Sequence, residues 1–128
     1  MTAPRWLNSV LREFGAGIDL QNFELNNRNA AVMHFETGTS LRFEYAFESL
    51  VIAMEIPAPP ESDVIRQLLI YTQPERVMPF QLRVAFLSKT SSALMTARLS
   101  EHEVSLPAIN AVFTELWHLA EDFRRRIQ

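Results

Sequence analysis

Histidines and their carboxylate neighbours are the residues of this chain best suited to acid–base or metal chemistry. His118 follows Glu115 by three residues and precedes Asp122 by four, so the three side chains would share one face of a helix. Metal sites in helical bundles use this spacing, but they also need further carboxylates and a second such motif from other helices. We therefore expect His118 to pair with Asp122 on a helix surface and to bind no metal.

The other two histidines favour neither catalysis nor metal binding. His34 is alone on one side of an expected strand, where a histidine is usually a surface or packing residue. His102 lies between two glutamates in an expected acidic turn, and no second histidine is near it in the sequence. We assign no catalytic residue; an enzymatic function would require His118 or His102 to matter.

Other residue patterns exclude the common catalytic and cofactor sites. The chain has three glycines, no glycine-rich phosphate loop, no Gly-x-Ser-x-Gly motif and no cysteine. The lack of cysteine excludes disulfides, thiolate metal ligands and cysteine nucleophiles, and it fits a reducing compartment. The sequence therefore predicts a binding protein that is not an enzyme and needs no cofactor.

Composition predicts one soluble domain that avoids nucleic acid and membranes. The 128 residues are 48% hydrophobic, and 12 basic against 15 acidic residues give a formal charge of −3. The basic run 124–126 lacks interleaved aromatic residues, so we expect a solvated helix end there. No apolar stretch reaches the ~18 residues of a membrane span, and residues 1–6 lack a signal-peptide pattern, which predicts a cytoplasmic location.

The N-terminal half shows a helical period and then a strand period. A helix is expected over residues 3–14, with its end at Gly15 and Gly17. Alternating apolar residues then predict an antiparallel meander. Its four strands are expected at 23–25, 31–36, 40–47 and 49–56. The last strand is an uninterrupted apolar run, which predicts cover on both of its faces.

The C-terminal half is expected to form a short helix, a hairpin and a long helix. The short helix begins at Ser62 or Asp63 and ends at Pro74, the hairpin comprises 80–86 and 93–99, and the long helix begins at Pro107. Residues 1–128 thus form a single α+β domain. Because the short helix is apolar on more than one face, we expect it to be buried against another chain, which predicts a dimer.

The whole chain resembles the class I type III secretion chaperones, the Tir-chaperone family of small acidic dimers. The resemblance rests on the segments 10–15 and 34–43, the short apolar middle helix, the strand end 94–99 and the closing helix. Segments 99–107 and 113–116 are similar to the branch that serves the secretion gatekeeper protein and works as a heterodimer.

The resemblance implies a fold and a way of binding. The fold would be an antiparallel twisted sheet of five to six strands with three helices. The protein would be a cytoplasmic homodimer, or a heterodimer with a sister chaperone, that holds the N-terminal segment of a secreted effector or gatekeeper protein in an extended state. Anchor side chains of this client would enter apolar grooves, and the client would add a strand to a sheet edge.

Two sets of apolar residues are predicted to carry these contacts, although each member could instead belong to the core. The client-binding groove is expected to comprise Trp6, Leu7, Val10, Phe14, Phe35, Phe43 and Tyr45. Trp6 is the strongest of these, since a large aromatic residue near a terminus is hard to bury. The dimer interface is expected to comprise Ile65, Leu68, Leu69, Leu82, Val84 and Phe86.

One alternative function belongs to a different class. The sheet and the long helix could enclose a pocket for a small apolar ligand, without catalysis. Its expected lining is Phe23, Phe43, Phe80 and Phe86.

Overall fold

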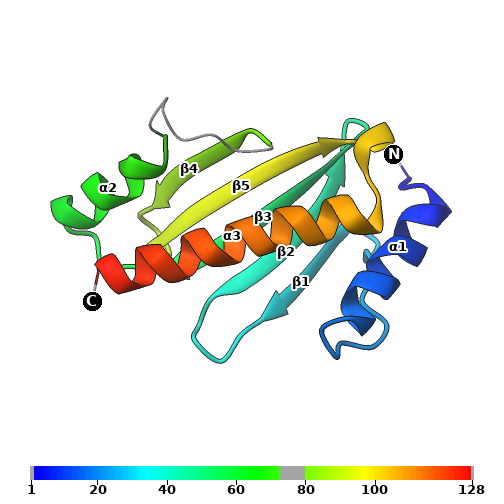
Figure 1. The fold of residues 1–128 in the computed structure, drawn as a ribbon, viewed down its shortest axis with the longest axis horizontal. Helices are drawn as coiled ribbons and strands as arrows, with labels where there is room; N and C mark the ends of the chain where they lie inside the picture. The colour runs from blue at the N-terminus through cyan, green and yellow to red at the C-terminus, as the bar shows by residue number, and fades with distance from the viewer. Residues whose placement is uncertain (1, 73–79, 128) are drawn as a thin grey trace.

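The computed structural model describes residues 2–72 and 80–127, which form three α-helices and one five-stranded sheet (Figure 1). The elements are α1 (Arg5–Ala16), β1 (Ala30–His34), β2 (Ser40–Ala46), β3 (Ser49–Pro57), α2 (Ser62–Leu69), β4 (Leu82–Leu87), β5 (Ser92–Ser100) and α3 (Leu106–Arg126), with short 3₁₀ turns η1 (Ile70–Thr72) and η2 (Glu101–Glu103). Their order and types confirm the predicted α+β fold. No helix in the described ranges is long and apolar enough to cross a membrane.

The sheet is antiparallel throughout and has the strand order β1-β2-β3-β5-β4. The longest pairing joins β3 to β5, from Ser49 opposite Ser100 to Pro57 opposite Ser92. Strands β1 and β4 form the two edges. Helix α3 runs across the sheet, while α1 and α2 lie at opposite ends of the molecule (Figure 1).

Strand alternation gives the sheet a core face and an open face. Side chains on the core face of β2 and β3, such as Phe43, Ile52 and Met54, are fully buried. On the open face of the same strands, Arg42 is exposed and Val51 is half-buried. The expectation that both faces of β3 are covered is therefore wrong for the single chain, because the three helices pack on one side.

Local chemistry sets the helix ends. Helix α3 begins after Ser105, whose hydroxyl accepts a hydrogen bond from the Ala108 N–H at 3.1 Å. Helix α1 ends at Ala16 with Gly17 as its C-cap, as predicted, but Gly15 lies inside its last turn and the helix extends two residues beyond the predicted end at Phe14. Gly15 also allows a close approach: a Cβ there would lie 2.6 Å from the Phe23 Cβ and 2.7 Å from the Leu20 oxygen. The chain after α1 therefore packs directly against its last turn.

One predicted strand is absent, and the middle helix is capped by Glu61 instead of the predicted Ser62 or Asp63. Residues 23–25 form no strand. Phe23 and Leu25 alternate because both side chains enter the core, and the Leu25 N–H donates to Asn8 Oδ1 at 2.9 Å instead of to a neighbouring strand. The middle helix begins after Glu61 and gives way to η1 at Ile70. The predicted end at Pro74 lies outside the described residues.

Candidate functional site

Large apolar side chains exposed on the described surface gather at the two ends of the molecule. Trp6 and Phe47, at the α1 end, are 42% and 81% exposed, and Ile65 and Leu69, on α2, are 40% and 52% exposed. Val32 is isolated on the open face of β1. Because exposed apolar groups that lie together mark binding surfaces, both ends are candidate sites.

At the α1 end, three segments that are far apart in the sequence line a shallow, open pocket of about 550 Å³. We call it the Trp6–Phe47 pocket. Its lining residues are Trp6, Phe47, Glu48, Ser49, Ser100, Glu101 and His102. The turn between β2 and β3 is tied to η2, since the Glu101 N–H donates to the Glu48 carbonyl at 2.9 Å. Ser100 and Glu103 form a capping box that fixes η2 itself. The pocket is therefore built on connected backbone.

The turn that carries Phe47 is conformationally strained. Ala46 pairs with Ser49, and both intervening residues have positive φ, 51° for Phe47 and 57° for Glu48. Two-residue hairpin turns with positive φ usually contain Asn-Gly, because a Cβ there lies too close to a carbonyl oxygen, which costs about 1 kcal/mol or more for most residues. Phe47 thus adopts a backbone conformation that is unfavourable for phenylalanine, and its apolar ring is exposed to water. Backbone strain of this kind is concentrated at functional sites.

Negative charge surrounds the aromatic side chains of the pocket. Glu48 and Glu101 take part in no ion pair within the described chain. Burial raises the pKa of the nearby Tyr45 hydroxyl, and the charges of Glu101 and Glu48 raise it further. Aromatic faces beside carboxylates favour an apolar segment that carries a lysine or arginine, through cation–π and charge contacts.

The α2 end presents a convex apolar surface. Ile65 and Leu69 are four residues apart and share one face of α2, whereas Val64 and Leu68 on the other side are buried. Beside α2 lies edge strand β4, with half-buried Leu82, Val84 and Phe86. All six predicted dimer residues thus belong to α2 or β4, and Leu68 is the one already buried within the chain.

A hydrogen-bond network connects α2 to α3 at this end. The Tyr71 hydroxyl donates to Asp122, which also accepts from Arg126 Nε at 2.9 Å. The hydrogen bond from Tyr71, and after it the bond from Arg126, hold the pKa of Asp122 below its usual value. Burial raises the pKa of Tyr71, and its bond to Asp122 raises it further.

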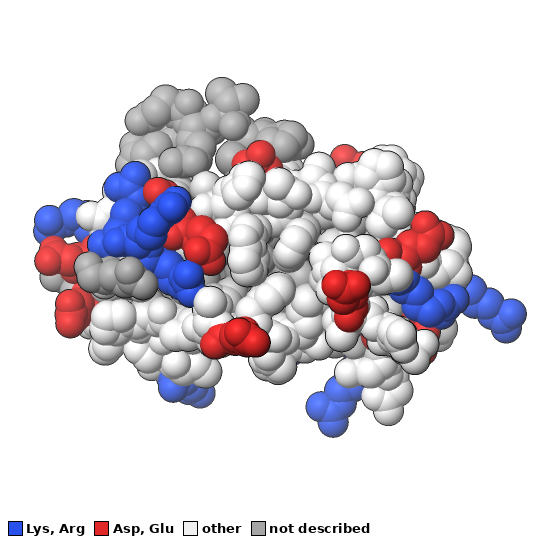
Figure 2. All heavy atoms as spheres, turned by 60° about the horizontal axis from the view of Figure 1, so that its bottom comes forward, with Lys and Arg blue, Asp and Glu red and all other residues white. Residues whose placement is uncertain are grey.

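Figure 2 shows basic side chains gathered where α3 ends, while the middle of that face carries few charges.

The network also corrects the expected role of His118. Asp122 bonds with Tyr71 and Arg126, so the predicted His118–Asp122 pair is replaced by contacts to other residues. His34, His102 and His118 are exposed. Within residues 2–72 and 80–127, no group of three or more metal-ligating side chains could hold an ion.

The predicted groove residues divide into core and surface. Leu7, Phe14, Phe43 and Tyr45 are buried. The Phe14 ring contacts those of Phe43 and Phe113 at centroid distances of 5.3 and 5.4 Å. They position α1 but present no free surface in the single chain. Trp6 is exposed, and Val10 and Phe35 are half-buried, with the Phe35 ring 4.9 Å from that of Trp117.

Phe47 is the residue that sequence reasoning missed. Strict alternation from Leu41 through Phe43 and Tyr45 placed it on the core face of β2. The strand ends one residue earlier, at Ala46, and the turn rotates the ring outward. The expected strands 40–47 and 49–56 left only residue 48 between them, and this was the available signal, because a tight hairpin needs a connection of at least two residues.

The alternative ligand pocket gains little support from the geometry. Phe23 and Phe43 pack edge to face, with ring centroids 5.4 Å apart, in a filled core. Phe80 and Phe86 are half-buried and belong to β4 or the residues just before it. The four rings therefore do not share one lining.

Comparison with known proteins agrees with this fold. A chain of the ExsC–ExsE complex superposes with a TM-score of 0.83 at 20% identity, over 99% of this chain and 97% of that one. A chain of the ExoU–SpcU complex of the Pseudomonas aeruginosa type III secretion system gives 0.70 at 16% identity, over 95% and 98%. The structure of the Yersinia pestis type III secretion chaperone SycH with a fragment of YscM2 gives 0.67 at 18% identity, over 91% and 98%.

Sequence comparison places the chain in a family. None of the curated proteins matches it significantly. The profile of the Tir chaperone protein (CesT) family matches residues 9–124, which include every helix and strand of the fold at least in part. The chain therefore belongs to the Tir chaperone protein (CesT) family.

Proposed function

We propose that this chain is a cytoplasmic chaperone, without enzymatic activity, that acts as a dimer on the N-terminal region of a type III secreted protein. Its client would stay soluble and extended while bound. The observation that carries the proposal is the Trp6–Phe47 pocket, where an aromatic side chain is held exposed on a strained turn. Similar structures, those of SycH with YscM2 and of ExoU with SpcU, are complexes in which a second protein is bound.

The pocket would take one anchor of the client. An apolar client side chain would pack between Trp6 and Phe47, and a neighbouring lysine or arginine would lie by Glu48 and Glu101. Half-buried Val10 and Phe35 are candidates for further anchors along the segment. An extended client could also pair with edge strand β1 through main-chain hydrogen bonds.

The α2 surface would form the dimer. Ile65 and Leu69 project from a short helix, next to half-buried side chains of β4. A second copy, or a sister chaperone, would cover both elements together. Because this surface lies at the opposite end from the pocket, a dimer would leave both client pockets accessible (Figure 1).

Co-expression tests the proposal directly. The chain would be produced with the first ~100 residues of candidate secreted proteins, a length able to wrap a chaperone, and the soluble fragment that co-purifies would identify the client. We expect Phe47→Asn to reduce capture while raising the free energy of unfolding by up to about 1 kcal/mol, because asparagine tolerates positive φ. Thr90→Asn is the matched control, since Thr90 is exposed in the turn between β4 and β5, at the other end of the sheet from the pocket. Equal capture by Phe47→Asn would contradict the role of the pocket.

A further inference from the structure

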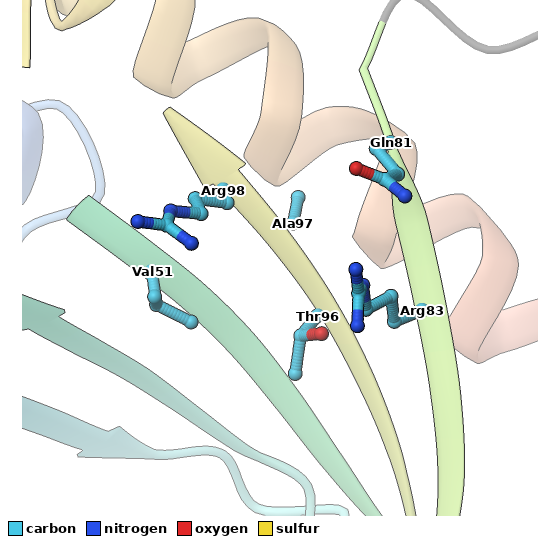
Figure 3. A pocket seen from close by; sticks show the side chains of 6 residues that line it. All are labelled: Val51, Gln81, Arg83, Thr96, Ala97 and Arg98. Atoms are coloured by element: carbon cyan, nitrogen blue, oxygen red, sulfur yellow. The ribbon is translucent and has the colours of Figure 1, made fainter. Parts of the chain in front are cut away.

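The open face of the sheet contains a hollow of about 270 Å³ over strands β3, β5 and β4. Its lining residues are Val51, Gln81, Arg83, Thr96, Ala97 and Arg98. Figure 3 shows Arg83 leaning from β4 toward β5, with Thr96 beside it, and Arg98 leaning from β5 toward Val51 on β3. The hollow shares no residue with the Trp6–Phe47 pocket. Arg83 belongs to β4, but it lies on the opposite face of that strand from the predicted dimer residues Leu82, Val84 and Phe86.

The polar groups that line this hollow are suited to an anion. The guanidinium groups of Arg83 and Arg98 donate only, and the Gln81 amide and the Thr96 hydroxyl add further donors. Strand pairing fixes their arrangement, because Arg83 lies opposite Thr96 and Arg98 opposite Val51. No carboxylate lines the hollow.

Both arginines lack an acidic partner within residues 2–72 and 80–127. Arg42, on the same open face, differs in this respect, since its Nε lies 3.2 Å from Glu44 Oε2. Like charges on adjacent strands repel each other, and an anion in the hollow would relieve that repulsion. In a chain of net charge −3, this is a local site of positive charge.

We propose that the hollow binds the carboxylate side chain of an aspartate or glutamate in an extended protein segment laid across the open face. Charge complementarity selects the carboxylate, which a guanidinium group can bind through two parallel hydrogen bonds. Val51 and Ala53, beside the arginines, are only half-buried. They favour a protein segment over a free anion as the ligand, because a bound chain would also cover their exposed apolar surface. The proposal goes beyond the proposed function, since it needs neither the dimer nor the Trp6–Phe47 pocket.

Binding of synthetic peptides tests the proposal. The probe is a fluorescent peptide in which glutamate alternates with threonine, and the matched peptide has glutamine in place of glutamate. We expect saturable anisotropy changes with the glutamate peptide alone, together with shifts of the Arg83 and Arg98 Nε–H signals in NMR spectra. Arg83→Gln or Arg98→Gln should weaken binding about tenfold, as the loss of a charged hydrogen bond predicts.

Arg42→Gln is the charge-matched control and should change affinity less than about twofold. Arg83→Lys and Arg98→Lys keep the charge, and an intermediate affinity would support recognition by the guanidinium fork. If Arg42→Gln weakened peptide binding as much as Arg83→Gln or Arg98→Gln, the proposal would be overturned, because binding would then depend only on the net charge of the open face. Binding of inorganic phosphate as tight as that of the glutamate peptide would also overturn it, by identifying a free-anion site. Thermal unfolding of each variant shows whether it is folded.

Discussion

Both ends of this molecule expose large apolar side chains, but the two surfaces differ in shape. At the α1 end, Trp6 and Phe47 line a concave pocket beside Glu48 and Glu101. At the α2 end, Ile65 and Leu69 stand on a convex helix, and no carboxylate lies between them in the sequence. A concave acidic pocket suits single side chains of an extended segment, whereas a convex apolar face suits an equally broad partner surface.

The ends also differ in how they are attached to the core. Helix α1 is fixed by the aromatic cluster around Phe14 and by the close approach at Gly15. Helix α2 depends on two buried aliphatic residues and on the Tyr71–Asp122 hydrogen bond just after it. We therefore expect client binding to need a rigid end and dimerisation to tolerate some adjustment of α2.

The largest effect is expected from placing charge on the α2 surface. The double variant Ile65→Asp with Leu69→Asp should raise the dimer dissociation constant by about 100-fold or more, because two buried carboxylates would have no partner. Sedimentation equilibrium, alone or with a sister chaperone, measures this constant. Val32→Asp adds a charge at a site of similar exposure on the sheet and should have no effect. A double variant that still dimerises normally would place the interface elsewhere.

Removing the indole ring of Trp6 from the pocket should weaken client binding but leave the dimer intact. Trp6→Ala should weaken client binding by about 30-fold, as expected for an aromatic anchor worth about 2 kcal/mol. Calorimetry with the client fragment measures the affinity. If Ile65→Asp with Leu69→Asp weakened client binding to the same degree, the two ends would not act independently.

Gly15 tests the rigidity of the α1 end. Gly15→Ala should lower the free energy of unfolding by about 2 kcal/mol, because its Cβ would overlap the Phe23 Cβ and the Leu20 carbonyl. Gly17→Ala is the control: its Cβ would come no closer than 3.4 Å to the Phe14 carbonyl oxygen, and its φ of −67° suits alanine. Urea unfolding of both variants measures the difference, which would vanish if the chain after α1 could shift freely.

Tyr71 tests the attachment at the α2 end. Tyr71→Phe should cost about 1 to 2 kcal/mol through loss of its bond to a charged acceptor. The pKa of Asp122 is lowered in the folded protein, so this stabilisation is present above the ordinary pKa of aspartate and is lost as the pH falls through the lowered pKa. Unfolding at several pH values should therefore show the difference between the two proteins shrinking in acid. A constant difference would assign the effect to packing alone.

The sequence predicted the fold better than the site, for physical reasons. Alternation in β2 identified Leu41 and Phe43 as core residues, because a strand with one covered face imposes period 2 on its side chains. The same period wrongly predicted a strand at Phe23 and Leu25, which lie in a loop whose side chains enter the core. It also misplaced Phe47, because a two-residue turn rotates the ring out of the pattern.

The Trp6–Phe47 pocket could not have been predicted in full. Its lining comes from the start of α1, a hairpin turn and η2. Sheet pairing between β3 and β5 brings the turn and η2 together, whereas α1 is placed by packing on the core. Trp6 is the one lining residue that the sequence analysis singled out, as a large aromatic residue close to the N-terminus. The histidines, the residues with the most chemical potential, proved to be exposed and dispersed.

The different settings of the two tryptophans provide the protein with built-in optical reporters. Trp6 is half-exposed in the pocket, whereas Trp117 is half-buried against Phe35. With Trp117→Phe, the remaining emission should shift to shorter wavelength when a client excludes water from the indole ring. With Trp6→Phe, the emission of Trp117 should instead follow the unfolding of the core. Binding and unfolding can thus be observed separately in one chain without an attached dye.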